Sequence, residues 1–259
     1  MTEWNASGYN RESTLQQTMA QEQLAMLTLT GTERILDVGC GDGKITAAIA
    51  ERVPSGSVMG VDPSSDMVAF AADHFSTHTN LRFAVADARR LPYRNEFDLA
   101  VSFNALHWVP EQGEALASIH AVLKPNGRAM LRLVPDGKRE SLEDVIEEIR
   151  KQPRWSSHFA SFNKPYLHLS AEEYRALAEK TGFKVLRLDV LDKAWDFKTR
   201  EGFVAFGRVT FVEWIKHIPE ESWNDFITEV LDRYRTVASE TEADANTFKF
   251  FQMEVELAK

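Results

Sequence analysis

Between residues 30 and 135, short apolar runs alternate with amphipathic helical stretches, and this rhythm constrains the fold more than any other feature. Strands are expected at 33–39, 57–62, 81–87, 97–104 and 128–134. The helices are expected at 12–29, 44–53, 64–75 and 111–123. Because strands that alternate with helices form βαβ units, the pattern predicts a parallel sheet with right-handed crossovers.

After residue 135 the rhythm changes, and the chain becomes richer in helices and aromatic residues. Helices are expected at 140–151, 170–181, 199–217 and 219–238, and strands at 183–191 and 247–258. The last stretch alternates apolar and polar residues, which predicts an antiparallel edge strand added to the parallel sheet. No linker separates this part from the first, so one domain with a helical cap is expected.

Composition excludes several classes of protein. The net charge of -9 argues against a nucleic-acid partner, and no apolar run approaches the length of a membrane span. The single cysteine, Cys40, rules out an internal disulfide and favours a reducing, cytoplasmic setting. No metal site is predicted, because the seven histidines are dispersed along the sequence.

The first strand leads into a glycine-rich turn, "ILDVGCGDGKIT", at residues 35–46. Glycines there let the chain turn sharply and let backbone approach a ligand without an intervening Cβ. The dinucleotide pattern G-x-G-x-x-G fails at Lys44, and the spacing of a phosphate loop is absent. The pattern that fits is D-x-G-x-G-x-G, formed by Asp37, Gly39, Gly41 and Gly43.

This pattern resembles the first motif of the class I S-adenosylmethionine-dependent methyltransferases. Asp62 in "GVDPS" and Asp87 in "VADARRLPY" end the next two strands, where the family carries carboxylates. Taken alone, each could simply cap the following helix. "FDLAVSFNALHWV" and "VLKPNGRAMLRL" resemble the fourth and fifth strand motifs, so the resemblance covers residues 30–135.

The resemblance implies an α/β fold with a Rossmann-like, seven-stranded, mostly parallel sheet, one antiparallel edge strand, helices on both faces and a cap from C-terminal insertions. The single domain 1–259 would comprise an N-terminal helical segment (1–30), a cofactor-binding core (31–135), and cap helices with the last two strands (136–259). The implied cofactor is S-adenosylmethionine, with S-adenosylhomocysteine as product. The residues implied to bind it are Asp37, Gly39, Cys40, Gly41, Asp62, Pro63, Asp87, Ala88 and Asn104.

Two further stretches, "YNRESTLQ" (9–16) and "NALHWVPEQGEAL" (104–116), resemble the small-molecule carboxyl methyltransferases of the juvenile-hormone-acid and trans-aconitate types. The resemblance implies that Gln16 and Trp108 hold a substrate carboxylate through N–H groups, beside His107. A carboxylate needs no general base, since it is already ionised at neutral pH. Further candidates for substrate contact are Tyr9, Trp155 and Tyr166.

Two alternatives remain open at this point. One is methylation of nitrogen, carbon or a hydroxyl oxygen in a small metabolite, with His107 as base. The other is a protein that binds the cofactor without catalysis. The sequence leaves the acceptor and the oligomeric state, monomer or homodimer, undetermined.

Overall fold

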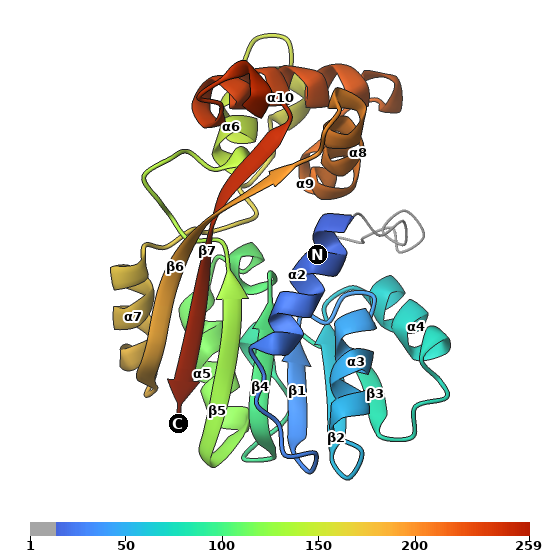
Figure 1. Cartoon of the computed structure of the whole chain (residues 1–259), viewed down its shortest axis with the longest axis vertical. Helices are drawn as coiled ribbons and strands as arrows, with labels where there is room; N and C mark the ends of the chain where they lie inside the picture. Colours follow the sequence, from blue (N-terminus) through green and yellow to red (C-terminus); the bar gives the residue numbers. More distant parts are fainter. Residues whose placement is uncertain (1–13) are drawn as a thin grey trace. The chain divides into compact units, whose positions relative to one another are not determined.

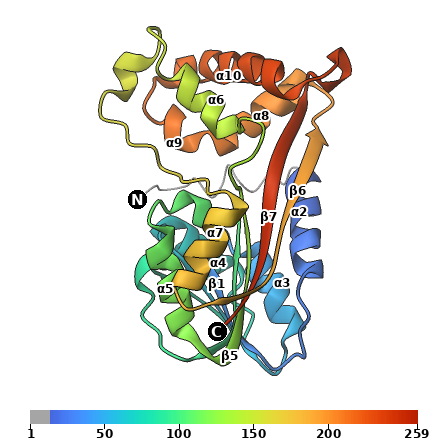
Figure 2. The ribbon, with the colours of Figure 1, turned by 90° about the vertical axis from the view of Figure 1, so that its left-hand side faces the viewer.

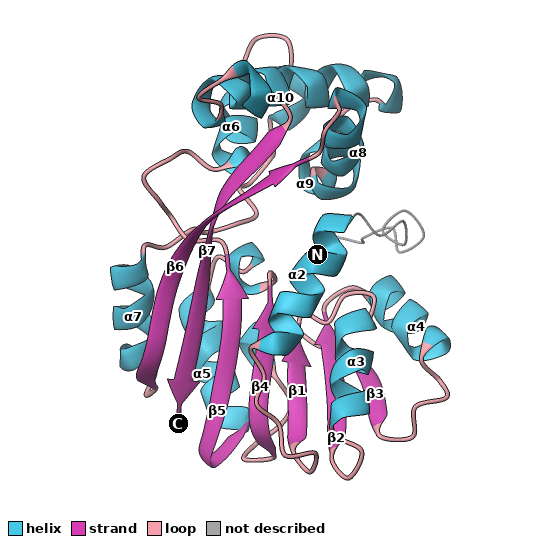
Figure 3. Ribbon diagram, viewed as in Figure 1, coloured by secondary structure: helices cyan, strands magenta, loops and turns pink. Residues whose placement is uncertain are grey.

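The chain forms a seven-stranded sheet with the strand order β3-β2-β1-β4-β5-β7-β6 (Figures 1 and 3). The structure is a computed structural model that describes residues 14–259, except for the side chains of Thr14, Gln16 and Gln17. The strands are β1 (Arg34–Val38), β2 (Ser57–Asp62), β3 (Leu81–Val85), β4 (Phe97–Phe103), β5 (Leu123–Leu133), β6 (Lys184–Asp196) and β7 (Thr247–Ala258).

Strands β1 to β5 are parallel, and β1 lies between β2 and β4, with Asp37 opposite Gly60 and Val101. Strand β7 runs antiparallel to β5, with Leu131 opposite Val255. The predicted sheet is therefore confirmed. Its antiparallel strand is β7, and β6 lies outside it at the edge.

The helices follow the predicted pattern closely. They are α2 (Thr14–Ala25), α3 (Lys44–Arg52), α4 (Ser65–His74), α5 (Gln112–Val122), α6 (Leu142–Ile149), α7 (Ala171–Lys180), α8 (Arg200–Thr210), α9 (Val212–Ile215) and α10 (Trp223–Ala238). The helix expected over 199–217 is interrupted at Phe211, which separates α8 from α9. Strand β6 continues five residues beyond the expected end at 191.

Apolar side chains fill both faces of the sheet, because successive residues of a strand point to opposite sides. Leu36 joins the cluster that includes Ile119 of α5 and Tyr174 of α7. Its neighbour Ile35 joins the cluster that includes Ile49 of α3. This double burial explains why β4, "FDLAVSF", reads as an almost continuous apolar run.

The chain divides into two compact units. Among the described residues, unit 1 comprises 14–135, 166–190 and 253–259, and unit 2 comprises 136–165 and 191–252. Unit 2 contains α6, α8, α9 and α10, which pack around buried aromatic rings such as Trp214 and Phe226. The single domain expected from the sequence stays a prediction. Within residues 14–259, no helix combines the length and apolarity that crossing a membrane requires.

Candidate active site

The turn between β1 and α3 contains three glycines, each with a positive φ. At Gly39, with φ +81°, an added Cβ would lie 2.2 Å from the Cβ of Ala105. At Gly43 it would meet Ala71 and the ring of Phe83 at 2.8 Å. At Gly41 nothing lies within 4 Å. Gly39 and Gly43 are thus needed for packing, and Gly41 is the glycine that presents bare backbone to open space.

Asp37, at the end of β1, is a buried carboxylate only 3% exposed. Its Oδ2 accepts a hydrogen bond of 2.7 Å from Oγ1 of Thr46, a residue of α3. Burial raises the pKa of Asp37 from 3.8 to about 7, the Thr46 bond opposes that rise, and the nearby charge of Asp62 adds to it. A cation placed beside this carboxylate would stabilise its ionised form.

Asp62 ends β2 beside the same turn. Its Oδ2 accepts the N–H of Gly41 at 3.0 Å, and its Oδ1 accepts the N–H of Ser64 at 2.9 Å, beyond Pro63. Burial raises the pKa of Asp62, and these two hydrogen bonds oppose the rise. Each carboxylate oxygen retains a lone pair, so Asp62 can still accept hydroxyl donors from a ligand.

Cys40 is buried beneath the turn. Its backbone N–H donates to the Val61 carbonyl at 3.0 Å, and so does that of Gly39 at 2.7 Å. Burial raises the pKa of the Cys40 thiol well above its ordinary value, and the carboxylates of Asp37 and Asp62 add to that effect. The thiol is therefore protonated and unsuited to nucleophilic attack.

Asp87 follows β3 and caps the 3₁₀ turn η1 (Ala88–Arg90). The guanidinium of Arg89 donates hydrogen bonds to this carboxylate. Its Nε lies 3.0 Å from both oxygens, and a terminal nitrogen lies 2.6 Å from Oδ2. This clamp lowers the pKa of Asp87. Arg89 also pairs with Glu111 at 2.9 Å. Sequence analysis did not predict this contact, although the position of Arg89 two residues after Asp87 was available as a signal.

An aromatic cluster lies after β4, where the 3₁₀ turn η2 (Leu106–Trp108) carries two of the predicted residues. The ring of Trp108 packs edge-to-face on Tyr166 with centroids 6.2 Å apart, and His107 lies 5.3 Å from Trp108. The ring of His168, a residue that sequence analysis did not name, has its centroid 4.5 Å from that of Tyr166 and 6.0 Å from that of His107. The structure thus brings His107, Trp108 and Tyr166 together.

Two hydrogen bonds fix the returning segment 166–169 to this cluster. The N–H of Leu167 donates to the His107 carbonyl at 2.9 Å, and the Gln112 side chain donates to the Leu167 carbonyl at 2.7 Å. His107 is 3% exposed, and its Nδ1 has no hydrogen-bond partner in the described chain. Burial, with a smaller effect of His168, holds the pKa of His107 well below 6.5. Its imidazole is therefore neutral at physiological pH.

Asn104 joins β4 to η2 with φ +57°, a conformation that asparagine tolerates better than most residues. Its N–H donates to the carbonyl of Arg132 at 2.7 Å. Arg132 itself is buried, and it pairs with Glu254 of β7 at 2.6 Å and with Glu22 of α2 at 3.2 Å. This ion-pair network, which sequence analysis missed, fixes α2 to the sheet.

Other predicted residues lie elsewhere. Tyr9 falls outside the described residues, and so does the side chain of Gln16, whose backbone belongs to α2. Trp155 lies in unit 2, where it is 3% exposed and its indole N–H donates to Glu229 at 2.9 Å. Its predicted contact with substrate stays a prediction.

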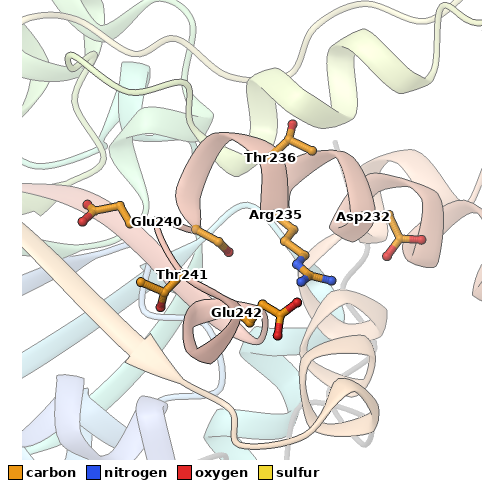
Figure 4. A pocket seen from close by; sticks show the side chains of 7 residues that line it. Asp232, Arg235, Thr236, Glu240, Thr241 and Glu242 are labelled. Atoms are coloured by element: carbon orange, nitrogen blue, oxygen red, sulfur yellow. The ribbon is translucent and has the colours of Figure 1, made fainter.

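Unit 2 also has a shallow hollow of about 490 Å³ at the end of α10 (Figure 4). Its lining is Asp232, Arg235, Thr236, Ser239, Glu240, Thr241 and Glu242. All of these except Ser239 are exposed. The hollow therefore lacks the buried carboxylates and bare backbone that mark the carboxyl end of the sheet in unit 1.

Comparison with known proteins agrees with this geometry. A family model described as a methyltransferase domain matches residues 35–127, from β1 to β5. A trans-aconitate 2-methyltransferase from Delftia acidovorans is 27% identical over 244 residues, which cover 90% of each protein. The matched domain and this relative support the class I S-adenosylmethionine-dependent methyltransferase family. The chain is therefore a methyltransferase, and S-adenosylmethionine is its cofactor.

Other relatives of this methyltransferase extend the comparison. A putative methyltransferase of Invertebrate iridescent virus 6 is 26% identical over 232 residues, covering 89% of this chain and 85% of that protein. The crystal structure of a putative methyltransferase from Bacillus halodurans has a TM-score of 0.63 at 17% identity, covering 93% of this chain and 98% of that chain. At that identity the structural match shows the shared fold.

Proposed function

We propose that this methyltransferase transfers a methyl group to the carboxylate oxygen of a small organic acid. The observation that carries the proposal is the burial of His107 beside the aromatic cluster, which holds its pKa well below 6.5 and so makes its imidazole a weak base. A carboxylate has a pKa of about 4 and needs no base, whereas an ammonium or hydroxyl acceptor does. The likeness to a trans-aconitate 2-methyltransferase supports the same acceptor class.

The cofactor would bind at the carboxyl ends of β1 to β4, where ligands of such sheets bind. The open space at Gly41 and the buried carboxylate of Asp37 fit its amino-acid portion, which carries an ammonium group. Asp62 would accept the ribose hydroxyls, and Asp87 with the Ala88 N–H would meet the adenine. The other residues proposed to line this site are Gly39, Cys40, Pro63 and Asn104.

The bound cofactor supplies an electrophilic methyl group attached to a sulfonium. The chain's own residues would then align the acceptor carboxylate in line with that group, and alignment is worth several kcal/mol. Trp108 would donate its indole N–H to the carboxylate, with Tyr166 packed edge-to-face against it. Gln16 and Tyr9 would complete the acceptor site. Neutral donors suit this task, because a tighter ionic grip would stabilise the ground state and oppose reaction.

The test is a product screen with methyl-labelled S-adenosylmethionine. Purified protein would be offered tricarboxylates, fatty acids and terpenoid acids, with alcohols and amines as controls. We expect a base-labile methyl ester from one class of acid. A base-stable product from alcohols or amines alone would refute carboxyl methylation, and cofactor binding without any product would indicate a non-catalytic protein.

Two variants then separate the roles within the cluster. Trp108→Phe keeps an aromatic ring but removes the N–H, so we expect weaker binding of the acid and slower transfer. His107→Gln keeps a neutral polar group of similar size, so transfer should fall by less than about tenfold. A loss of about a hundredfold or more in His107→Gln, with cofactor affinity unchanged, would favour His107 as a base.

A further inference from the structure

Strand β6 forms an open border of the sheet. It is the last strand in the sheet order, and no strand of residues 14–259 lies beyond it (Figure 2). Large apolar side chains on it are exposed, Leu186 by 47% and Val190 by 41%. An open strand edge with exposed apolar residues is a template for pairing with another strand.

The sequence of β6 is complementary to itself when it is read antiparallel about Leu188. In that register Leu188 faces Leu188 of a second copy, and Leu186 faces Val190. Arg187 faces Asp189, so opposite charges meet. Cross-strand pairs of this kind stabilise antiparallel sheets. A two-fold axis at Leu188 repeats each pair that lies off the axis, so every match except that of Leu188 with Leu188 occurs twice.

The complementarity continues along the strand. The next positions pair Val185 with Leu191, and the following ones pair Lys184 with Asp192. Every pair in the register 184–192 is therefore apolar with apolar or cation with anion. A register moved by one residue would lose this matching, because side chains exchange faces and charges meet apolar groups.

The charged groups of this strand are accessible within one chain. Arg187 pairs with Asp189 at 2.9 Å, and the side chains remain 41% and 50% exposed. Arg187 also lies 3.5 Å from Glu254. These groups can extend their ion pairs across an interface without being drawn from the core.

We propose that two copies of this chain pair through β6, antiparallel about a two-fold axis at Leu188, to form a continuous sheet across the dimer. The partner is a second copy of the chain, because the β6 edge is complementary to itself in both charge and apolar character. The proposal does not depend on which acceptor the enzyme methylates.

A cysteine at the axis tests the register directly. In Leu188→Cys the two thiols would face each other at cross-strand Cα separations of about 4.5–5.5 Å, within disulfide reach. The matched control is Leu186→Cys, whose two copies would lie about 13 Å apart, since four residues separate them along the strand. The native Cys40 is buried and should not react. We expect a disulfide-linked dimer on a non-reducing gel for Leu188→Cys and none for the control.

Paired variants test the same register without oxidation. Leu186→Lys or Val190→Glu alone places a charge against an apolar residue, so the dimer dissociation constant should rise by about tenfold or more. The double variant, which combines Leu186→Lys with Val190→Glu, brings opposite charges together across the interface and should recover most of the lost affinity. Analytical ultracentrifugation of the full chain, over a range of concentrations, measures the dimer dissociation constants of the two single variants and the double variant.

Three results would overturn the proposal. The first is a wild-type chain that stays monomeric at every concentration, which would leave the edge to a different occupant or to solvent. The second is a dimer whose affinity neither single variant changes. The third is equal cross-linking of Leu186→Cys and Leu188→Cys, which would indicate an interface without this register.

Discussion

The buried carboxylate of Asp37 lowers the stability of the folded state at neutral pH, and it is also proposed to bind the cofactor. The variant Asp37→Asn separates these two effects. The carboxylate is fully buried, and its pKa is about 7, whereas the ordinary value is 3.8. Below about pH 3 both folded and unfolded chains hold the proton. As the pH rises toward 7 the unfolded chain loses it first, so the stability of the folded state decreases. Between pH 5 and pH 8 the loss is about 2 to 3 kcal/mol.

Asparagine is neutral and can still accept the hydrogen bond from Thr46, so Asp37→Asn removes this pH dependence. We expect the variant to gain about 2 to 3 kcal/mol relative to wild type between pH 5 and pH 8, measured by urea unfolding at both values. Its affinity for S-adenosylmethionine should fall, because the proposed partner of the ammonium group is gone. An equal stability difference between variant and wild type at both pH values would refute a raised pKa at Asp37.

Further predictions concern the glycine turn and the buried ion pair of Arg132. Gly39→Ala should destabilise the fold by about 2 to 5 kcal/mol, since the new methyl meets Ala105 at 2.2 Å in a left-handed conformation. Gly41→Ala has only the conformational cost of about 1 to 2 kcal/mol, so its main effect should be a higher KM for the cofactor; similar melting temperatures for the two variants would contradict this distinction. Arg132→Met should destabilise by about 3 to 5 kcal/mol in urea unfolding, because it leaves buried Glu254 without this cation, and adding Glu254→Leu should recover part of the loss. A double variant no more stable than Arg132→Met would contradict that reasoning.

The positions of the residues proposed to bind the cofactor could largely be predicted from the sequence, because their signals are local. Apolar runs located β1 to β5, and the residues that end them, Asp37, Asp62 and Asp87, lie where strand ends must lie in a parallel sheet. The glycine turn was also recognisable, although the sequence could not separate Gly41, which faces open space, from its packed neighbours.

The remainder depends on contacts between distant segments. No local pattern indicated that residues 166–169 would return to η2 and place His168 beside Tyr166. Trp155 was a candidate for substrate contact because it is aromatic, yet its N–H is satisfied by Glu229, which lies 74 residues away. The interruption at Phe211 likewise had no local signal, since the sequence continues in a helical pattern there.

The most direct test of the account is the pH dependence of single-turnover methyl transfer, at saturating cofactor, to the acid that the product screen identifies. We expect the rate to be constant from about pH 6 to about pH 9 and to fall by less than about tenfold in His107→Gln, because the acceptor carboxylate is already ionised and needs no base. A loss of about a hundredfold or more in His107→Gln at saturating acceptor would show that His107 takes a proton and would contradict carboxyl methylation.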